Sequence, residues 1–325
     1  MAGAMAQSYF TLVLARMGVG ALEAPASPGS LSIIGDLFPK KKRATAVSLY
    51  YAGTATGQMI TFLIGGWLLL HFGWRALFLI AGIPGLFFAA MLFFTCREPK
   101  RGRYDDEKEP AEPISYKLAV KSIAASMPLR NAIVANMLAT GLNYTALVWA
   151  ISFLVRIHGM SHEYAAMAVG LGIGFMMMVG STIAGFAADR YSRGVVSRLA
   201  RVPAFGCFFA ATFGIVMCFM PSLPLALTAM CILSVFMGIN TGPGYATLVS
   251  LSNPHMRGSI LSLAKMISIL GNGFFAFMTG ELSDMIGGPE SIRWAMVITI
   301  AIYYLASLQF TITSRSAARA EQQGA

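Results

Sequence analysis

The amino-acid sequence predicts an all-α, polytopic membrane protein with about nine transmembrane helices, and three observations carry this prediction. Of the 325 residues, 56% are hydrophobic and only 12% are charged, whereas soluble domains carry roughly 25% charged residues. The apolar residues are gathered in long runs, and about 20 of them in a row suffice for one helix to cross a bilayer. Lys and Arg lie almost entirely between these runs, as expected for the loops of a membrane protein.

The nine expected spans follow one another along the chain. Backbone N–H and C=O groups in a bilayer core must be paired inside the protein, so we expect each apolar run to form a helix. The runs cover residues 10–35, 44–70, 76–95, 131–155, 165–188, 202–220, 223–250, 260–284 and 292–313.

The distribution of Lys and Arg predicts how the spans are oriented. Of the 24 basic residues, 19 lie on one side of the expected membrane and three on the other, while Arg16 and Lys265 lie inside spans. Cytoplasmic loops are the ones enriched in Lys and Arg, so we expect the richer side and the C-terminus in the cytoplasm. The net charge of +10 therefore follows from membrane topology, and we expect no nucleic acid as a partner.

One long polar stretch, residues 97–130, interrupts the apolar runs. It combines proline with charges of both signs, which is typical of a linker, and its basic residues predict a cytoplasmic position. It divides the chain into a partial bundle of three spans, residues 1–96, and a bundle of six spans, residues 131–314. The remaining residues, 315–325, are expected to form a cytoplasmic tail.

An internal repeat relates the two bundles. In each bundle an Arg precedes a span, and Gly residues follow it 14 and 23 positions later. The first set is Arg43, Gly57 and Gly66, and the second is Arg257, Gly271 and Gly280. Self-similarity of this kind indicates related structural units, so the three spans of the first bundle correspond to the last three of the second. We therefore expect the first bundle to lack three helices on its N-terminal side.

Several motifs resemble those of the major facilitator superfamily, a transporter fold of two six-helix halves. Residues 185–194, GFAADRYSRG, resemble the superfamily's G-x-x-x-D-R-x-x-R loop between helices eight and nine. Residues 16–24, RMGVGALEA, resemble the R-x-x-x-G-x-G-E-A motif of its spinster-like branch, although Leu22 stands in place of the second glycine. The resemblance covers nearly the whole chain from the family's fourth helix onward. It implies a major facilitator fold that is N-terminally truncated and lacks the equivalent of helices one to three.

The resemblance implies secondary active transport by alternating access, in a bacterial inner membrane and in contact with its lipids. Alternating access exposes one solute site near the bilayer midplane to each side in turn. We expect protons to be the coupling ion, because the chain contains no nucleotide-binding G-x-x-x-x-G-K-[ST] pattern. The expected solute is a small organic anion or a lipid-like amphiphile. We expect no cofactor, no bound metal and no enzymatic activity, since the sequence contains no convincing catalytic cluster.

Two alternatives to this interpretation stay open. The stretch EAPASP, residues 23–28, also resembles the anion–cation symporters, so an organic-anion symporter of that branch is the first alternative. The second is a truncated remnant that does not transport, because the spinster-like branch typically takes an acidic, proton-coupling residue from its first helix.

Polar residues inside the expected spans are the candidates for the solute and proton pathway. Arg16 and Glu23 are seven residues apart, so they share one helix face with Gly20 and Ser27. A charge inside a bilayer is costly and is normally turned inward and paired. We therefore expect this face to border a central cavity and Glu23 to exchange a proton; a structural pair between helices is the alternative. The pathway candidates are Arg16, Glu23, Tyr50, Gln58, Asn143, Tyr144, Asn240, Lys265 and Asn272.

Lys265 and the amide side chains each have a second interpretation. Lys265 lies five residues into its expected span, from where its ammonium could also reach the membrane surface. Amide side chains such as Asn143 and Asn240 need partners inside a bilayer, so they could join helices instead of binding solute. Aromatic residues beside the amides suit a solute with an apolar body and a polar end.

Five charged residues are expected to form a cytoplasmic gate. Asp189, Arg190 and Arg193 belong to the stretch that resembles the superfamily's G-x-x-x-D-R-x-x-R loop. The resemblance implies charge pairs there that tie the two halves together in one conformation. Asp36 and Arg43 occupy the equivalent loop of the first bundle. The alternative is an ordinary solvated turn.

Overall fold

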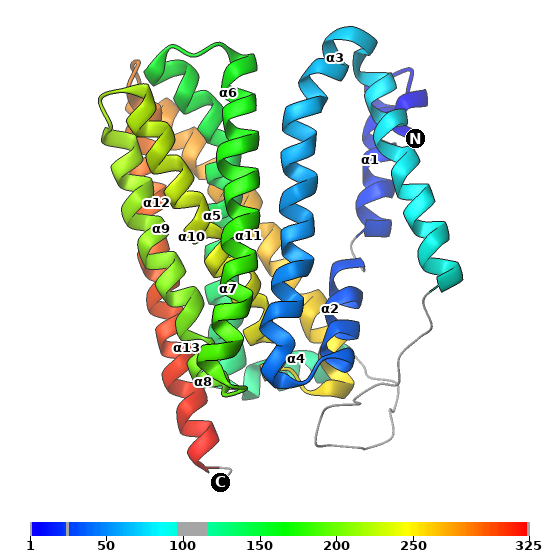
Figure 1. The fold of residues 1–325 in the computed structure, drawn as a ribbon, viewed down its shortest axis with the longest axis vertical. Helices are drawn as coiled ribbons and strands as arrows, with labels where there is room; N and C mark the ends of the chain where they lie inside the picture. Colours follow the sequence, from blue (N-terminus) through cyan, green and yellow to red (C-terminus); the bar gives the residue numbers. More distant parts are fainter. Residues whose placement is uncertain (1, 24–25, 96–115, 324–325) are drawn as a thin grey trace.

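The computed structural model describes residues 2–23, 26–95 and 116–323, and all the regular secondary structure in these ranges is helical (Figure 1). Seven segments within them are long and apolar enough to cross a membrane, as predicted for a polytopic α-helical protein. They are His71–Thr95, Met127–His158, His162–Ser192, Val196–Phe219, Leu223–Leu251, Pro254–Ile286 and Ser291–Gln322.

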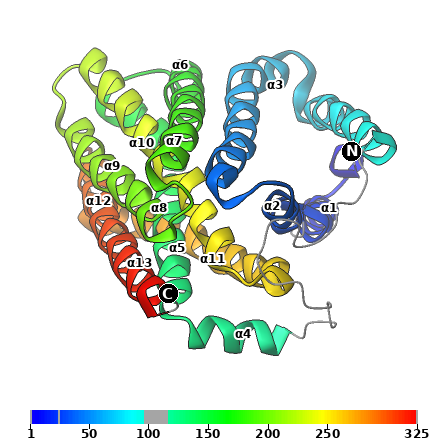
Figure 2. The same cartoon turned by 60° about the horizontal axis from the view of Figure 1, so that its bottom comes forward.

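The six segments from Met127 onward form one bundle of parallel and antiparallel rods (Figures 1 and 2). Ser126 caps the first helix by accepting a hydrogen bond from the Leu129 N–H, and Gly159 ends that helix with a φ of +68°. The helices are α5 (Met127–His158), α6 (His162–Val169), the π-helix η3 (Gly170–Phe175), α7 (Met176–Ser192), α8 (Val196–Leu199), α9 (Arg201–Phe219), α10 (Leu223–Leu251), α11 (Arg257–Ile286), α12 (Ser291–Ala301) and α13 (Tyr303–Gln323).

The N-terminal part of the chain packs beside this bundle (Figure 2). It consists of the 3-10 turn η1 (Ala2–Met5), α1 (Tyr9–Glu23), α2 (Ala26–Leu37), the 3-10 turn η2 (Lys40–Lys42) and α3 (Arg43–Thr95). The expected span 10–35 thus includes α1 and α2, while residues 24–25 lie outside the described ranges.

Helix α3 contains the expected spans 44–70 and 76–95 as two arms. The arms meet at Gly73, whose φ of +73° and ψ of 169° lie outside the helical region and favour glycine. When α1 and α2 are taken as one span and the arms of α3 as two, the described ranges match the predicted number of about nine helices.

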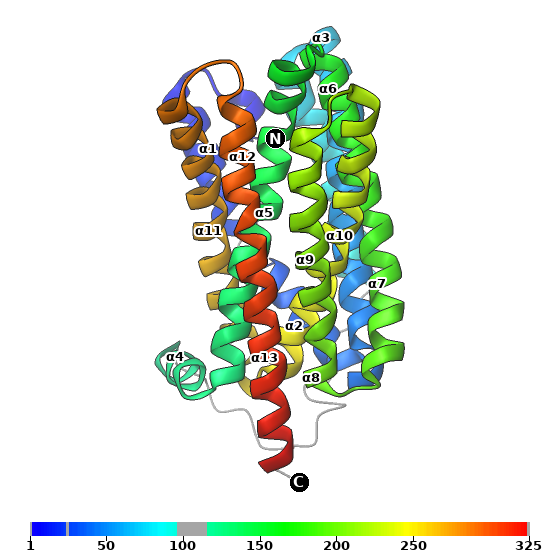
Figure 3. The ribbon, with the colours of Figure 1, turned by 90° about the vertical axis from the view of Figure 1, so that its left-hand side faces the viewer.

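Part of the segment expected as a linker is helical. Residues 96–115 lie outside the described ranges, but Tyr116–Ala125 form α4, and α5 already begins at Met127. Ala119 on α4 is fully buried, because one side of this helix packs against α5 and α11. Helix α4 therefore lies across the rods at one end of the bundle (Figures 2 and 3).

The internal repeat is visible in the structure as a shared local geometry. Arg43 and Arg257 are the first residues of α3 and α11, and each follows a 3-10 turn, η2 or η4 (Pro254–Met256). Arg43 Nη2 donates to the Gly35 carbonyl at 2.7 Å. Arg257 Nε donates to the Val249 carbonyl at 3.3 Å. In both cases the acceptor lies eight residues before the arginine, so the two segments fold alike.

Glycines bring the backbones of α7 and α10 into direct contact. A Cβ atom at Gly180 would overlap the Val235 carbonyl, and one at Gly238 would overlap the Met177 carbonyl. Small residues at helix crossings are the common way for membrane helices to pack, since apolar burial alone does not distinguish helix from lipid. This crossing fixes α7 and α10 as one wall of the bundle.

One end of the molecule is strongly basic. The turn η2, helix α8 and the C-terminus lie at this end, at the bottom of Figure 1. It carries Lys40, Lys41 and Lys42 of η2 and Arg198 of α8. We call it the basic end.

Candidate solute cavity and the contacts that close its basic end

The first chamber of the candidate site lies between α3 and the bundle of six rods. Its volume is about 120 Å³. The hydroxyl groups of Thr140, Thr241 and Ser268 each donate to the carbonyl four residues earlier on their own helix, which leaves their lone pairs as acceptors. The lining residues are Tyr51, Thr54, Gln58, Thr140, Asn143, Tyr144, Leu147, Ile173, Met177, Met237, Thr241, Tyr245, Lys265, Ser268 and Asn272.

A second chamber adjoins the first on the side of α1 and α2. Its volume is about 390 Å³, and its lining residues are Gly20, Ala26, Ser27, Tyr50, Tyr51, Thr54, Lys265 and Ile269. The shared wall consists of Tyr51, Thr54 and Lys265. Together the two chambers have the size and mixed polarity of a small-molecule site.

Lys265 is the only charged residue among the described residues that line these two chambers. Its Nζ lies 5.9 Å from the centre of the Tyr245 ring, within the range of a cation–π contact. It also lines a third cavity, of about 410 Å³, which lies between α4 and the outer side of α11 and includes Tyr116, Met266 and Leu270. Lys265 therefore sits where a central cavity and a lateral cavity meet.

Three aromatic rings continue the wall beside Lys265. Tyr51 of α3 stacks on Tyr245 of α10, with ring centres 4.6 Å apart and an interplanar angle of 22°. Tyr50 meets Tyr51 edge to face at 5.3 Å. The stack joins the N-terminal part of the chain to the bundle directly beside the chambers.

A buried polar network lies behind one wall of the first chamber. Asn143 Nδ2 donates to Asn240 Oδ1 at 3.3 Å and to Thr241 Oγ1 at 3.0 Å. The Tyr303 hydroxyl donates to Asn143 Oδ1 at 2.5 Å. Both amide hydrogens of Asn143 are therefore engaged within the protein. Asn143 and Thr241 line the chamber, whereas Asn240 and Tyr303 lie behind them.

The structure brings most of the predicted pathway residues to the chambers. Tyr50, Gln58, Asn143, Tyr144, Lys265 and Asn272 line them. Asn240 belongs to the network behind the wall. The guanidinium of Arg16 lies over the Phe78 ring at 4.3 Å and does not line either chamber.

The predicted polar face of residues 16–27 reaches the second chamber through Gly20 of α1 and Ser27 of α2. Both were expected to share a face with Arg16 and Glu23. The side chain of Glu23 lies outside the described part of the structure, so its predicted pairing with Arg16 stays a prediction.

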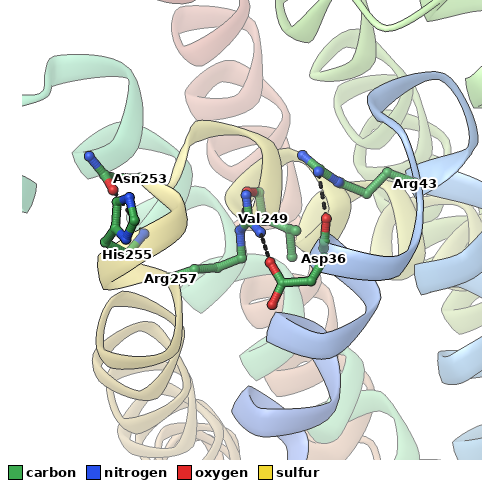
Figure 4. Close-up of polar contacts among 7 residues, drawn as sticks. Asp36, Arg43, Val249, Asn253, His255 and Arg257 are labelled. Carbon is green, nitrogen blue, oxygen red and sulfur yellow. Dashed lines mark hydrogen bonds and ion pairs between the residues drawn. The ribbon is translucent and has the colours of Figure 1, made fainter. Parts of the chain in front are cut away.

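Two carboxylates join the N-terminal part of the chain to the bundle at the basic end. Asp36 Oδ1 of α2 lies 3.1 Å from Arg257 Nη1 of α11 (Figure 4). Asp189 of α7 accepts hydrogen bonds from the Ala44 N–H at 3.0 Å and the Thr45 N–H at 2.8 Å. These two N–H groups belong to the first turn of α3, where a negative charge is favourable.

The other residues expected in the gate have different positions. Arg43 donates to the Gly35 carbonyl within its own part of the chain (Figure 4). Arg190 and Arg193 are exposed, and Arg193 ends α7 with a φ of +49°. One helical turn beyond the Asp189 contacts on α3 lies Ser48, which was not among the residues expected from the sequence.

Ser48 is fully buried where α3 meets α7 and α10. Its backbone carbonyl accepts a hydrogen bond from Ser181 Oγ at 3.0 Å. A Cβ atom at Gly185 of α7 would lie 2.6 Å from Ser48 Cβ, and one at Gly242 would overlap Ser48 Oγ. The two glycines therefore form a socket for Ser48. The glycine of the GFAADRYSRG stretch was the sequence signal for this close approach.

Comparison with known families identifies the class of protein. Residues 1–276 match the model of the Major Facilitator Superfamily, so the chain belongs to this family of multi-pass membrane transporters. Two solved structures share the fold. A bacterial homolog of the human lysosomal transporter Spinster, in an inward-facing conformation, matches with a TM-score of 0.66 and 24% identity, over 97% of this chain and 80% of that one. The transporter FucP, in the outward conformation, matches with a TM-score of 0.69 and 18% identity, over 94% and 77%.

Three of the named relatives are transporters of organic acids by name. A probable galactarate/D-glucarate transporter, GudP, from Bacillus subtilis is 29% identical over 45% of this chain and 36% of its own length. The cis,cis-muconate transport protein of Acinetobacter baylyi is 28% identical over 90% of this chain and 68% of its own length. A probable L-galactonate transporter of Escherichia coli is 24% identical over 90% and 67%. The chain thus spans about a third of GudP and about two thirds of the other two.

Proposed function

We propose that this chain is a secondary transporter of a small organic anion that works by alternating access. The observation that carries the proposal is the position of Lys265. It is the charged residue in the described lining of both central chambers, and an ammonium in a partly desolvated cavity attracts a carboxylate strongly. Amide, hydroxyl and aromatic side chains around it supply hydrogen bonds and an apolar surface for the rest of the solute.

A carboxylic acid is the solute class that the comparisons favour. Relatives are named for galactarate and D-glucarate, cis,cis-muconate, L-galactonate and galacturonate, and all of these carry carboxylates at neutral pH. A lipid-like amphiphile with an anionic head is the second candidate. The lateral cavity between α4 and α11 favours it, because this cavity has an apolar lining and reaches Lys265.

Protons are the coupling ion in this proposal, with Glu23 as the exchanging group. Glu23 ends α1, and Gly20 and Ser27 on its expected face line the second chamber. The basic end faces the cytoplasm of a bacterial cell, since it carries the excess of Lys and Arg. The contacts of Asp36 and Asp189 then form the cytoplasmic gate, which must break for the cavity to open inward.

Uptake into proteoliposomes tests the proposal. Galactarate, galactonate, galacturonate and cis,cis-muconate are tried as labelled solutes, with and without an inward proton gradient. Replacing Lys265→Gln should raise the half-saturating solute concentration by about tenfold to a hundredfold, because a hydrogen bond to a charged group is worth roughly 1.5–3 kcal/mol. Lys265→Arg, which keeps the charge, should lose less.

Lys121→Gln is the matched control, because Lys121 is an exposed lysine on α4 and should leave uptake unchanged. Glu23→Gln should abolish the response to the proton gradient while solute exchange persists. Absence of flux for every solute in the wild-type chain would contradict the proposal and favour the remnant interpretation.

A further inference from the structure

Tyr51, Tyr245 and Lys265 form one continuous stack, which we call the aromatic column. Tyr51 lies face to face with Tyr245 at 4.6 Å, and the Lys265 ammonium lies 5.9 Å from the centre of the Tyr245 ring. Both rings are almost wholly buried, with exposed fractions of 8% and 2%. The three residues come from three helices, α3, α10 and α11, so the column spans the boundary between the N-terminal part and the bundle.

The column lies between the solute chambers and the basic-end contacts. Tyr51 is eight residues beyond Arg43, the first residue of α3, which is about 12 Å along a helix. Tyr245 is one helical turn before Val249, whose carbonyl accepts a hydrogen bond from Arg257. A movement that separates α3 from α10 from the basic end as far as the chambers must therefore also part the two rings.

The helix that carries Tyr245 can bend just before it. Pro243 lies inside α10 between Gly242 and Gly244, and it cannot donate the hydrogen bond that would reach back one turn. Proline and glycine inside membrane helices are common points of flexing. Gly242 is also one of the two glycines against Ser48, so the bend, the ring stack and the Ser48 socket lie within one turn of α10.

The position of Lys265 links the aromatic column to the solute chambers. A ring face attracts an ammonium because of its negative quadrupole, and the attraction is larger where water is excluded. A solute carboxylate in either chamber would compete for the same ammonium, and a charge-assisted contact is the stronger of the two. Binding an anion would therefore draw Lys265 away from Tyr245.

From these contacts we infer that the aromatic column is a latch that reports solute occupancy to the basic end. Without solute, Lys265 holds Tyr245 on Tyr51 and keeps the basic end closed. A bound anion takes the ammonium from the ring, loosens the stack and makes opening of that end easier. The effect of a bound solute, which we call the solute arm of this inference, rests on the proposed function. The contribution of Lys265 and the two rings to keeping the basic end closed does not.

Hydrogen–deuterium exchange of the protein in nanodiscs tests the latch without any solute. Tyr245→Leu removes the stack and the cation–π contact, so amides of residues 44–52 should exchange about threefold to tenfold faster than in the wild type. Tyr51→Leu should act alike and serves as an independent variant if the first does not fold. The matched controls Tyr245→Phe and Tyr51→Phe keep the rings and should exchange like the wild type.

Lys265→Met tests the contribution of the lysine separately from that of the two rings. It removes the ammonium while keeping a long apolar side chain, so exchange at residues 44–52 should rise about twofold to fivefold. Peptides from α9 and α12 report on folding and should not change. The inference of a latch is contradicted if both Leu variants exchange like their Phe controls, or if Lys265→Met exchanges like the wild type.

The solute arm uses whichever of the four carboxylates is taken up by the wild-type chain, added at saturating concentration. It should speed exchange at residues 44–52 in the wild type and have no further effect in Lys265→Met. A solute that is transported but slows exchange there, or acts equally in Lys265→Met, overturns the coupling. Failure of all four to be transported counts against the proposed function and its solute arm, while the solute-free variants still decide whether the column closes the basic end.

Discussion

Asp36 and Arg257 are 221 residues apart in the chain and form an ion pair between two helices. Asp36 Oδ1 lies 3.1 Å from Arg257 Nη1, and the two side chains are only 8% and 1% exposed. Asp36 belongs to α2 and Arg257 to α11 (Figure 4). The pair therefore ties the N-terminal part of the chain to the bundle in a place from which water is largely excluded.

Removal of Asp36 should be strongly destabilising. Asp36→Ala takes away the carboxylate and leaves the Arg257 guanidinium buried without it, and breaking a buried pair from one side costs about 3–5 kcal/mol. We expect a clear fall in the thermal midpoint of the detergent-solubilised protein. The control is Glu290→Ala, which breaks the exposed Arg293–Glu290 pair; such pairs are worth about 0–1 kcal/mol. Equal midpoints for the two variants would show that the buried pair does not stabilise this conformation.

Two helical glycines should respond in opposite ways to the same substitution. Gly238→Ala places a methyl group on the Met177 carbonyl at the crossing of α7 and α10, and overpacking of this kind costs about 1–3 kcal/mol. Gly273 on α11 has nothing within 4 Å of an added Cβ, so Gly273→Ala should be neutral or stabilise by up to about 1 kcal/mol. Thermal unfolding of both variants measures the difference. Similar losses in both would mean that helix crossing is not what selects glycine at position 238.

The membrane fold and its repeat could be predicted because they depend on local sequence. Apolar runs and the placement of Lys and Arg are visible along the chain, and Arg43 and Arg257 take equivalent positions with the same i−8 carbonyl contact. Helix α5 begins at Met127, before the expected span 131–155, because a hydropathy run shows the apolar part of a helix but not where the helix begins.

The candidate site was predicted only in part, because its contacts connect distant segments. Polar residues at helical spacing led to Gln58, Tyr144 and Asn272 in the chamber wall. The socket around Ser48 could not be found that way, since it depends on how closely α3 approaches two other helices. Arg16 was expected to turn toward the cavity, and its contact with Phe78 depends on the second arm of α3 folding back at Gly73.

Neighbouring tyrosines on α13 offer a matched test of the buried polar network. The fully buried Tyr303 hydroxyl donates to Asn143 Oδ1, whereas the Tyr304 hydroxyl bonds Thr212 Oγ1 at 3.0 Å in an exposed position. Tyr303→Phe removes the donor and leaves a buried acceptor with one partner fewer, at a cost of about 1–3 kcal/mol. Tyr304→Phe should change stability little, because the Thr212 hydroxyl keeps its own bond to the Phe208 carbonyl and no buried acceptor loses its partner. Chemical denaturation of both variants compares them, and a larger loss for Tyr304→Phe would contradict the network's role.

Asp189 should control how firmly the first turn of α3 is held at the basic end. Its carboxylate accepts from the Ala44 and Thr45 N–H groups, which have no partner inside the helix. Asp189→Ala removes both bonds, at a cost of about 0.5–2 kcal/mol for a lost N-terminal cap. Asp189→Asn keeps one acceptor and should lose less, chiefly the attraction of a negative charge to the helix terminus, about 0.3–1 kcal/mol.

The informative result is how the hydrogen-exchange rates of the wild type and these variants rank. Hydrogen exchange of the first α3 amides should be slowest in the wild type, faster in Asp189→Asn and fastest in Asp189→Ala. Arg190→Ala is the control, since Arg190 is the adjacent exposed residue on the same helix and should exchange like the wild type. Because the same carboxylate joins α7 to α3, faster exchange should be accompanied by easier opening of the basic end. Wild-type exchange in Asp189→Ala would show that this carboxylate is an ordinary solvated group and no part of the gate.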